Sequence, residues 1–172
     1  MNPNQPIPRI LAATVADLPT IARLAGIIWR AHYPGIISTE QIEYMLGKMY
    51  SLETLREDIL QRGIRYKLLF VGSKMAGFAA HGPTDKPKLF KLHKIYLHPE
   101  CQGHGLGSLL LRHCENEVRK LGADCLMLTV NKRNEKALAA YRRNGFAITD
   151  SVVVDIGGGF VMDDYVMTKE LL

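Results

Sequence analysis

The stretch QGHGLGSLLL, residues 102–111, constrains this chain more than any other segment. Three glycines alternate with other residues directly before an apolar run that begins at Leu106. Glycine loses more conformational freedom on folding than any other residue and is unfavourable inside helices and strands. A chain that places three glycines before a helix is therefore expected to need close approach of its backbone to another group.

A strand, a glycine-rich turn and the start of a helix together form an anion site. An apolar strand is predicted at 89–97, before the turn, and apolar residues recur at helical spacing over 106–121, after it. The first N–H groups of a helix have no partner within the helix, and the helix dipole adds partial positive charge there. We therefore expect the amides of residues 103–107 to surround a pyrophosphate.

Two common phosphate loops do not fit this spacing. A P-loop needs the pattern GxxxxGK[ST], and no lysine follows these glycines. A dinucleotide fingerprint needs GxGxxG in the first strand–helix–strand unit, but here Gly107 comes one residue early and the loop lies in the middle of the chain. A tight turn without a ligand is the remaining alternative.

The whole chain, residues 1–172, reads as one mixed α/β domain. Helical spacing and two capping boxes, Thr14 with Asp17 and Ser38 with Gln41, predict helices near the N-terminus. Strands are predicted where apolar runs are bounded by glycine or proline. The predicted strands cover residues 9–13, 66–71, 75–81, 89–97, 124–130, 146–156 and 160–168, and the later helices cover 106–121 and 135–143.

Composition argues against several classes of protein. No apolar run is long enough to span a membrane, and the N-terminus lacks the basic start and apolar centre of an export signal. The net charge of +5 is modest and no block of five like charges occurs, so nucleic acid is not expected as a partner. The three cysteines have no metal-site spacing, so we expect reduced cysteines, no metal and a cytoplasmic protein.

Charge is distributed unevenly along the second half of the chain. Residues 112–143 contain eight basic and four acidic side chains, whereas residues 144–172 contain one basic and five acidic ones. Two solvated surfaces would explain this pattern. An anion site beside a cation site would explain it equally well.

Two segments resemble the GNAT superfamily of N-acetyltransferases. The first, LHKIYLHPECQGHGLGSLLL, is similar to its acyl-CoA-binding motif, with Gln102, Gly105 and Gly107 at the fixed positions. The second, LTVNKRNEKALAAYRRNGF, is similar to the strand and helix that follow in the family. Its matching residues are Asn134, Ala137, Tyr141, Gly145 and Phe146. The resemblance implies a single α+β domain of GNAT type, with a mixed central sheet of about seven strands and helices on both faces.

The resemblance also implies acetyl-CoA as the cofactor. The loop amides would hold its pyrophosphate, and the strand that ends at Leu97 would pair with its pantetheine arm where that strand splays from the next. Basic side chains such as Arg112, Lys136 and Arg143 are either solvated or paired with its phosphates. The cofactor-binding residues implied in this way are Ile95, Tyr96, Leu97, Gln102, Gly103, His104, Gly105, Leu106, Gly107, Ser108, Asn134, Ala137, Tyr141 and Arg143.

Acetyl transfer to an amine needs a proton acceptor for the amine and a proton donor for the leaving thiolate. The resemblance puts Tyr141 beside the thioester sulfur as the general acid, and ring packing under the sheet is the alternative. Many relatives carry a glutamate on the strand before the loop, where this chain has Lys91. Two residues on, His93 is a candidate for the base or for holding a water, because histidine titrates near neutral pH. A structural role is the alternative for His93.

The acceptor side is expected in an N-terminal helix and in the C-terminal tail. Trp29 and Tyr33 are four residues apart on one face of a predicted helix, which suits either an acceptor wall or the core. The tail DIGGGFVMDDYVMTKEL resembles that of bacterial spermidine/spermine acetyltransferases within the superfamily. This resemblance implies that Asp163 and Asp164 face a polycation.

We therefore expect an acetyl-CoA-dependent N-acetyltransferase that acts on a small cationic amine such as a polyamine. A protein N-terminal or lysine acetyltransferase, and a non-catalytic module that binds acyl-CoA, are the alternatives. The apolar stretch 160–167, interpreted as an edge strand, would suit a homodimer. No membrane partner is expected.

Overall fold

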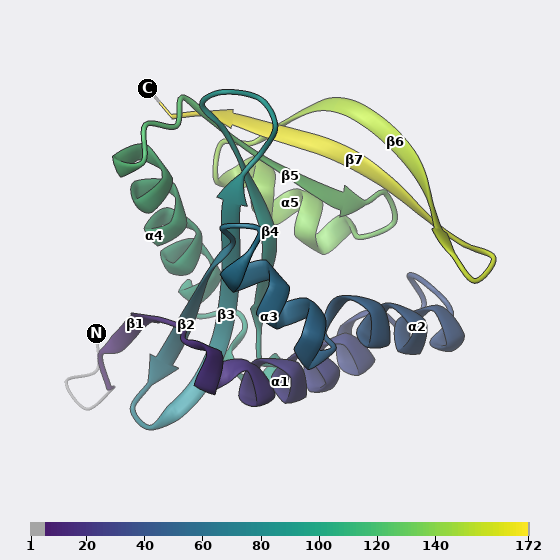
Figure 1. The fold of residues 1–172 in the computed structure, drawn as a ribbon, viewed down its shortest axis with the longest axis horizontal. Helices are drawn as coiled ribbons and strands as arrows, with labels where there is room; N and C mark the ends of the chain where they lie inside the picture. The colour runs from purple at the N-terminus through teal and green to yellow at the C-terminus, as the bar shows by residue number, and fades with distance from the viewer. Residues whose placement is uncertain (1–5, 172) are drawn as a thin grey trace.

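The computed structural model describes residues 6–171, and these form one seven-stranded sheet (Figure 1). The strands are β1 (Pro8–Ala12), β2 (Arg65–Val71), β3 (Lys74–Pro83), β4 (Leu89–Leu97), β5 (Cys125–Asn131), β6 (Ala147–Gly157) and β7 (Phe160–Glu170). They lie side by side in the order β1-β2-β3-β4-β5-β7-β6. Neighbouring strands are antiparallel except β4 and β5, which are parallel.

Five α-helices within residues 6–171 cover the two faces of this sheet (Figure 1). They are α1 (Leu18–His32), α2 (Thr39–Met49), α3 (Leu52–Leu60), α4 (Leu106–Lys120) and α5 (Glu135–Arg143), with short 3-10 turns at Val15–Asp17 and Pro99–Cys101. Apolar residues of α1, α2 and α3 pack on one face, and those of α4 and α5 pack on the other. None of these helices has both the length and the apolar character needed to cross a membrane.

The predicted fold class, a mixed seven-stranded sheet with helices on both faces, is confirmed. The strand expected at 89–97 and the helix expected at 135–143 coincide with β4 and α5. The second capping box is only half formed: Ser38 Oγ accepts from the Gln41 amide at 3.1 Å, but the Gln41 side chain does not return to it. That side chain instead donates to the carbonyl of Val161 at 2.8 Å, so Gln41 joins α2 to β7.

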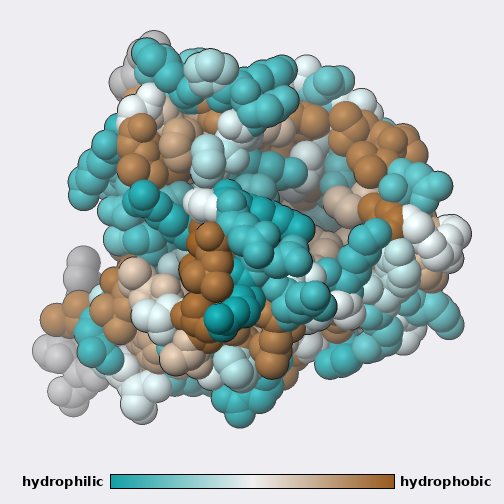
Figure 2. Space-filling view, in the orientation of Figure 1, coloured by the Kyte–Doolittle hydropathy of each residue, from teal (hydrophilic) through white to brown (hydrophobic). Residues whose placement is uncertain are grey.

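The edge of the sheet differs from the sequence interpretation. The stretch 160–167 is not an edge strand, because β7 lies between β5 and β6 and is paired on both sides. The edge is β6, where Val153 is 66% exposed and Val154 is 47% exposed. An apolar patch is visible over this hairpin in Figure 2. A homodimer stays a prediction.

The β6–β7 hairpin arches away from the sheet, and its tip reaches α2 (Figure 1). Tyr44 Oη donates to the carbonyl of Ile156 at 2.7 Å. The three glycines of the tip, 157–159, all have positive φ. A Cβ at Gly158 would lie 2.9 Å from the Tyr44 ring, so glycine is needed for this close contact. The contact fixes the hairpin beside α2.

Candidate functional site

The parallel strands β4 and β5 separate after only three paired residues. Pairing joins residues 89–91 to residues 125–127 and then ends. A cavity of about 580 Å³ opens beyond this point, lined by both strands and by residues of α1, α2, α4, α5 and β7. In the space-filling view, the surface is hollowed between the helices and the β6–β7 hairpin (Figure 2). The divergence of these two strands therefore creates the candidate site.

A β-bulge in β4 changes which side chains face this cavity. Ala80 of β3 pairs with Lys94, but the next residue, His81, pairs with Leu92, so His93 is the extra residue in β4. A bulge of this kind changes the direction of the side chains on either side of it. The extra residue, His93, lines the cavity.

The glycine loop forms one end of the cavity. Gly103 and Gly105 have φ of 82° and 75°, a backbone conformation that favours glycine, and Gly105 is the N-cap of α4. No atom lies within 4 Å of a Cβ built at either residue. Gly107 is helical, and a Cβ there would lie 3.6 Å from Leu97 Cδ1, an ordinary contact. The protein itself leaves this cradle open, which fits a pyrophosphate bound by the amides at a helix N-terminus.

Polar contacts hold the loop and α4 against α5. Lys136 Nζ donates to Gln102 Oε1 at 2.6 Å, and Asn144 Nδ2 donates to Ser108 Oγ at 3.1 Å. Buried Asn134 caps α5, with its side-chain oxygen accepting from an amide of the first turn at 3.2 Å. These contacts fix both walls of the anion-binding end.

Aromatic rings form another wall of the cavity. The Trp29 ring centroid lies 4.4 Å from that of Tyr33 and 5.9 Å from that of Tyr96. The hydroxyls of Tyr33 and Tyr96 are 3.4 Å apart. The methionines that line the cavity are Met45, Met49 and Met162. Rings of this kind attract cations, and methionine side chains adapt to alkyl chains.

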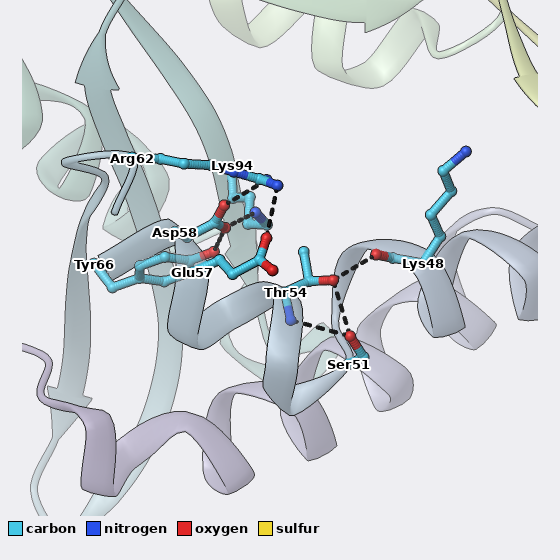
Figure 3. A network of polar contacts seen from close by, with 8 residues as sticks. All are labelled: Lys48, Ser51, Thr54, Glu57, Asp58, Arg62, Tyr66 and Lys94. Carbon is cyan, nitrogen blue, oxygen red and sulfur yellow. Dashed lines mark hydrogen bonds and ion pairs between the residues drawn. The ribbon is translucent and has the colours of Figure 1, made fainter. Parts of the chain in front are cut away.

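A buried ion pair ties β4 to α3 beside this wall (Figure 3). Asp58 Oδ2 accepts from Lys94 Nζ at 3.0 Å and from Tyr66 Oη at 2.5 Å. Arg62 donates to the other carboxylate oxygen at 3.3 Å. The charge of Lys94 is therefore matched within the protein, and the ion pair fixes β4 directly after the bulge.

Tyr141 lines the cavity, and its ring packs 5.9 Å from that of Phe146. Burial raises the pKa of Tyr141 to about 12, so the phenol keeps its proton at neutral pH. The pKa of Tyr33 is raised mainly by burial, and then by the nearby Tyr96, Tyr141 and Asp164. The phenol of Tyr141 and the carboxylate of Asp164 therefore both lie close enough to Tyr33 to influence its phenol.

His93 faces the cavity as a neutral imidazole. Its Nε2 is buried and has no hydrogen-bond partner within residues 6–171. Burial, followed by the charges of Lys91 and Lys94, lowers the pKa of His93 to about 4. The imidazole is free to accept a proton above that pH, but it is a weaker base than an ordinary histidine. The role of His93 as base stays a prediction.

The two aspartates of the tail point in opposite directions, because successive residues of a strand face opposite sides of the sheet. Asp164 lines the cavity and is only 4% exposed. Its side chain has no hydrogen bond or ion pair among the described residues, and burial raises its pKa to about 6. Asp163 lies outside the cavity, where its half-exposed carboxylate pairs with Lys132.

The cavity brings together most of the residues that the sequence indicated, although it does not by itself establish their roles. The residues that line it are Trp29, Tyr33, His93, Ile95, Tyr96, Leu97, Gln102, Gly103, Gly105, Gly107, Ser108, Asn134, Ala137, Tyr141, Arg143 and Asp164. Three predicted site residues do not line the cavity: Asp163, His104 and Leu106. His104 is exposed, and Leu106 packs against the core under α4.

Several lining residues escaped the sequence analysis. The clearest are Gln41 and the three methionines. Met45 and Met49 recur at helical spacing, which marks a buried face but does not separate a cavity wall from a core. Met162 and Asp164 are two residues apart on β7, so their side chains lie on the same face of that strand. This spacing was the signal in the sequence that could have identified Met162.

Comparisons with known proteins agree with this architecture. Residues 29–146 match the Acetyltransferase (GNAT) family. A spermidine N(1)-acetyltransferase of Thermoplasma acidophilum is 30% identical over 155 residues, covering 87% of this chain and 92% of that protein. The ribosomal protein bS18 alanine N-acetyltransferase of Escherichia coli is 35% identical over 98 residues, covering 56% of this chain and 64% of that protein. The crystal structure of the PaiA N-acetyltransferase of T. acidophilum in complex with coenzyme A has a TM-score of 0.81 and 27% identity, covering 95% of this chain and 99% of that chain.

The fold, the splayed strands and the glycine cradle define an acyltransferase. The family match covers more than half of the chain, so this chain belongs to the GNAT family. It is an acetyl-CoA-dependent N-acetyltransferase. When bound, acetyl-CoA supplies the acetyl group that is transferred, and the glycine cradle fits its pyrophosphate.

Gly105→Val should remove acetyl-CoA binding while leaving the fold. The substitution places a branched side chain in the cradle and strains a backbone with φ of 75°. We expect acetyl-CoA affinity, measured by calorimetry, to fall about 100-fold or more, which is ~2.7 kcal/mol. Gly122→Val is the matched control, because Gly122 also has positive φ and open surroundings but lies at the far end of α4. Equal affinities in the two variants would remove the loop from the site.

Proposed function

We propose that the acetyl acceptor is a small cationic amine that carries an alkyl chain, such as a polyamine. The observation that carries this proposal is the buried carboxylate of Asp164 in a cavity walled by aromatic rings and methionines. A carboxylate attracts an ammonium group, the rings add cation–π attraction, and the methionines suit methylene spacers. The relative that acts on spermidine covers most of both chains, which supports the same class of acceptor.

Two residues of the chain have proposed roles in the chemistry. Tyr141 is the proton donor to the departing sulfur, because burial keeps its phenol protonated at neutral pH. Asp164 orients the amine from the opposite side of the cavity. Asn134 and Lys136 serve indirectly, since the first caps the helix that carries Tyr141 and the second holds Gln102 of the loop.

The proposal includes a cytoplasmic location, because the cysteines are free and the acetyl donor is a cytoplasmic metabolite.

Acetylation of a protein N-terminus is the second candidate. The E. coli relative named for ribosomal protein bS18 alanine supports it, although that match covers only 56% of this chain. A peptide presents its reacting amine next to a carbonyl group and continues as a chain, whereas a polyamine presents further cationic nitrogens. The two acceptors are therefore distinguished by their charge.

A panel of amines decides between these candidates. The wild-type protein is incubated with acetyl-CoA and with spermidine, spermine, putrescine or a short peptide with a free N-terminal alanine, and release of free thiol is followed. We expect kcat/KM for spermidine to exceed that for the peptide by at least ~10-fold, equivalent to ~1.4 kcal/mol of barrier. A preference for the peptide would replace the proposal with N-terminal acetylation, and no thiol release with any of these amines would reject both acceptor classes.

Tyr141→Phe tests the proposed acid, because it keeps the buried ring and removes only the hydroxyl. We expect kcat to fall about 100-fold, which corresponds to ~2.7 kcal/mol of barrier. Thermal stability and acetyl-CoA affinity should change little, since the hydroxyl makes no hydrogen bond to the residues that the structure describes. Tyr165→Phe, on β7 and outside the cavity, is the control for loss of a phenol. A wild-type kcat in Tyr141→Phe would show that solvent or another group protonates the sulfur.

A further inference from the structure

Asp164 differs from the other carboxylates near the cavity because the protein does not neutralise it by direct contact. Asp58 accepts hydrogen bonds from three side chains, and Asp163 pairs with Lys132. Asp164 is 4% exposed, lines the cavity and has no such partner within residues 6–171. A buried carboxylate without a partner is costly, and a bound cation removes that cost.

The strand register places this carboxylate where the two parallel strands are apart. Asp164 pairs with Asn131, the last residue of β5, whereas β4 leaves β5 after Lys91. Asp164 therefore lies beyond the paired part of β4 and β5. Asn131 also lines the cavity at this point.

Several charged and titratable groups on neighbouring elements influence Asp164 or are influenced by it. They are Lys91 of β4, Tyr33 at the C-cap of α1, Lys132 after β5 and its own neighbour Asp163. Burial is the main cause that raises the pKa of Asp164, Lys91 lowers it most among the charges, and the result is about 6. His93 lines the same cavity from β4.

We propose that Asp164 accepts the proton of the attacking amine. This inference rests on the proposed amine acceptor. Asp164 takes one proton from the bound ammonium group, and the neutral nitrogen then forms the bond to the acetyl carbon while the carbon–sulfur bond breaks. Tyr141 gives its proton to the sulfur and regains one from the nitrogen, and Asp164 later releases its proton to solvent.

The surroundings favour this transfer over transfer to the histidine. An apolar cavity destabilises both an ammonium group and a carboxylate, so it lowers the pKa of the first and raises that of the second. Both changes promote transfer of the proton from nitrogen to oxygen. Burial raises the pKa of Asp164 and lowers that of His93, so the cavity favours the carboxylate over the imidazole as the group that holds the proton.

The pH dependence of kcat/KM tests the proposal in the acetylation of whichever amine the protein accepts. The wild-type profile should rise with pH through a limb near the pKa of Asp164, about 6, because the carboxylate must be deprotonated to act. Asp164→Asn should lose this limb and reduce kcat/KM by about 10²- to 10⁴-fold, the usual contribution of a general base. Asp164→Glu should keep a limb at a reduced rate. Asp163→Asn, next in sequence but outside the cavity, should keep the rate and a limb that moves to lower pH, because the charge of Asp163 raises the pKa of Asp164.

Lys91→Met provides a second check that the limb belongs to Asp164. Removing this positive charge raises the pKa of Asp164, so the limb should move to higher pH while the plateau rate is retained. A limb that stays near pH 6 in Lys91→Met would assign it to another group. A wild-type limb near pH 4 that disappears in His93→Ala would overturn the role of Asp164 and assign the base to His93.

Direct titration of the carboxylate separates this inference from the proposed function. In protein labelled with ¹³C at the aspartate carboxyls, one resonance should titrate near pH 6, be missing in Asp164→Asn and titrate at higher pH in Lys91→Met. If no amine is acetylated, the proposed function fails, whereas acetylation at full rate with an unchanged limb in Asp164→Asn would overturn this inference alone. An Asp164 resonance that titrates at the ordinary value near ~3.9 would overturn it. Circular dichroism and acetyl-CoA affinity verify that each variant is folded.

Discussion

The early separation of β4 from β5 is the constraint on which the rest of the site depends. Only residues 89–91 pair across these parallel strands. Beyond them, the N–H and C=O groups that β4 turns toward β5 have no partner in β5, and buried backbone groups require partners. A ligand with its own amides, such as the pantetheine arm of acetyl-CoA, can supply them. The cavity, the exposed backbone of β4 and the position of the glycine loop at its end all follow from this separation.

The two ends of the cavity carry opposite electrostatic character. At one end, the N-terminus of α4 and the side chains of Lys136 and Arg143 favour phosphates. At the other end, the free carboxylate of Asp164 favours a cation, whereas Lys94 is matched by Asp58. Two buried charges are tolerated where they form an ion pair. Removing either partner leaves a single buried charge, which destabilises the folded protein. The unmatched carboxylate of Asp164 is therefore the group that we propose binds the amine.

Much of this arrangement was predictable from local sequence. The glycines of 103–107 and the apolar runs around them indicated the anion end, and the family resemblance added Tyr141 and Asn134. Long-range pairing was not predictable. Whether β6 or β7 forms the edge depends on which strand joins β5, and this is decided by packing over the whole sheet. The same register decides that Asp164 faces the cavity and Asp163 faces away. The environment of His93 depends on a bulge, which depends on β3 as well as on β4.

The central claim is that acetyl-CoA and a cationic amine occupy the two ends of one cavity at the same time. A conjugate in which coenzyme A is joined to spermidine through an acetyl bridge tests this claim most directly. Because the two parts are linked, the second binds with a high effective concentration, and the conjugate should bind about 100-fold or more tightly than coenzyme A in calorimetry. Asp164→Asn should remove most of that gain without changing the affinity for coenzyme A alone. A conjugate that binds no more tightly than coenzyme A would contradict the account.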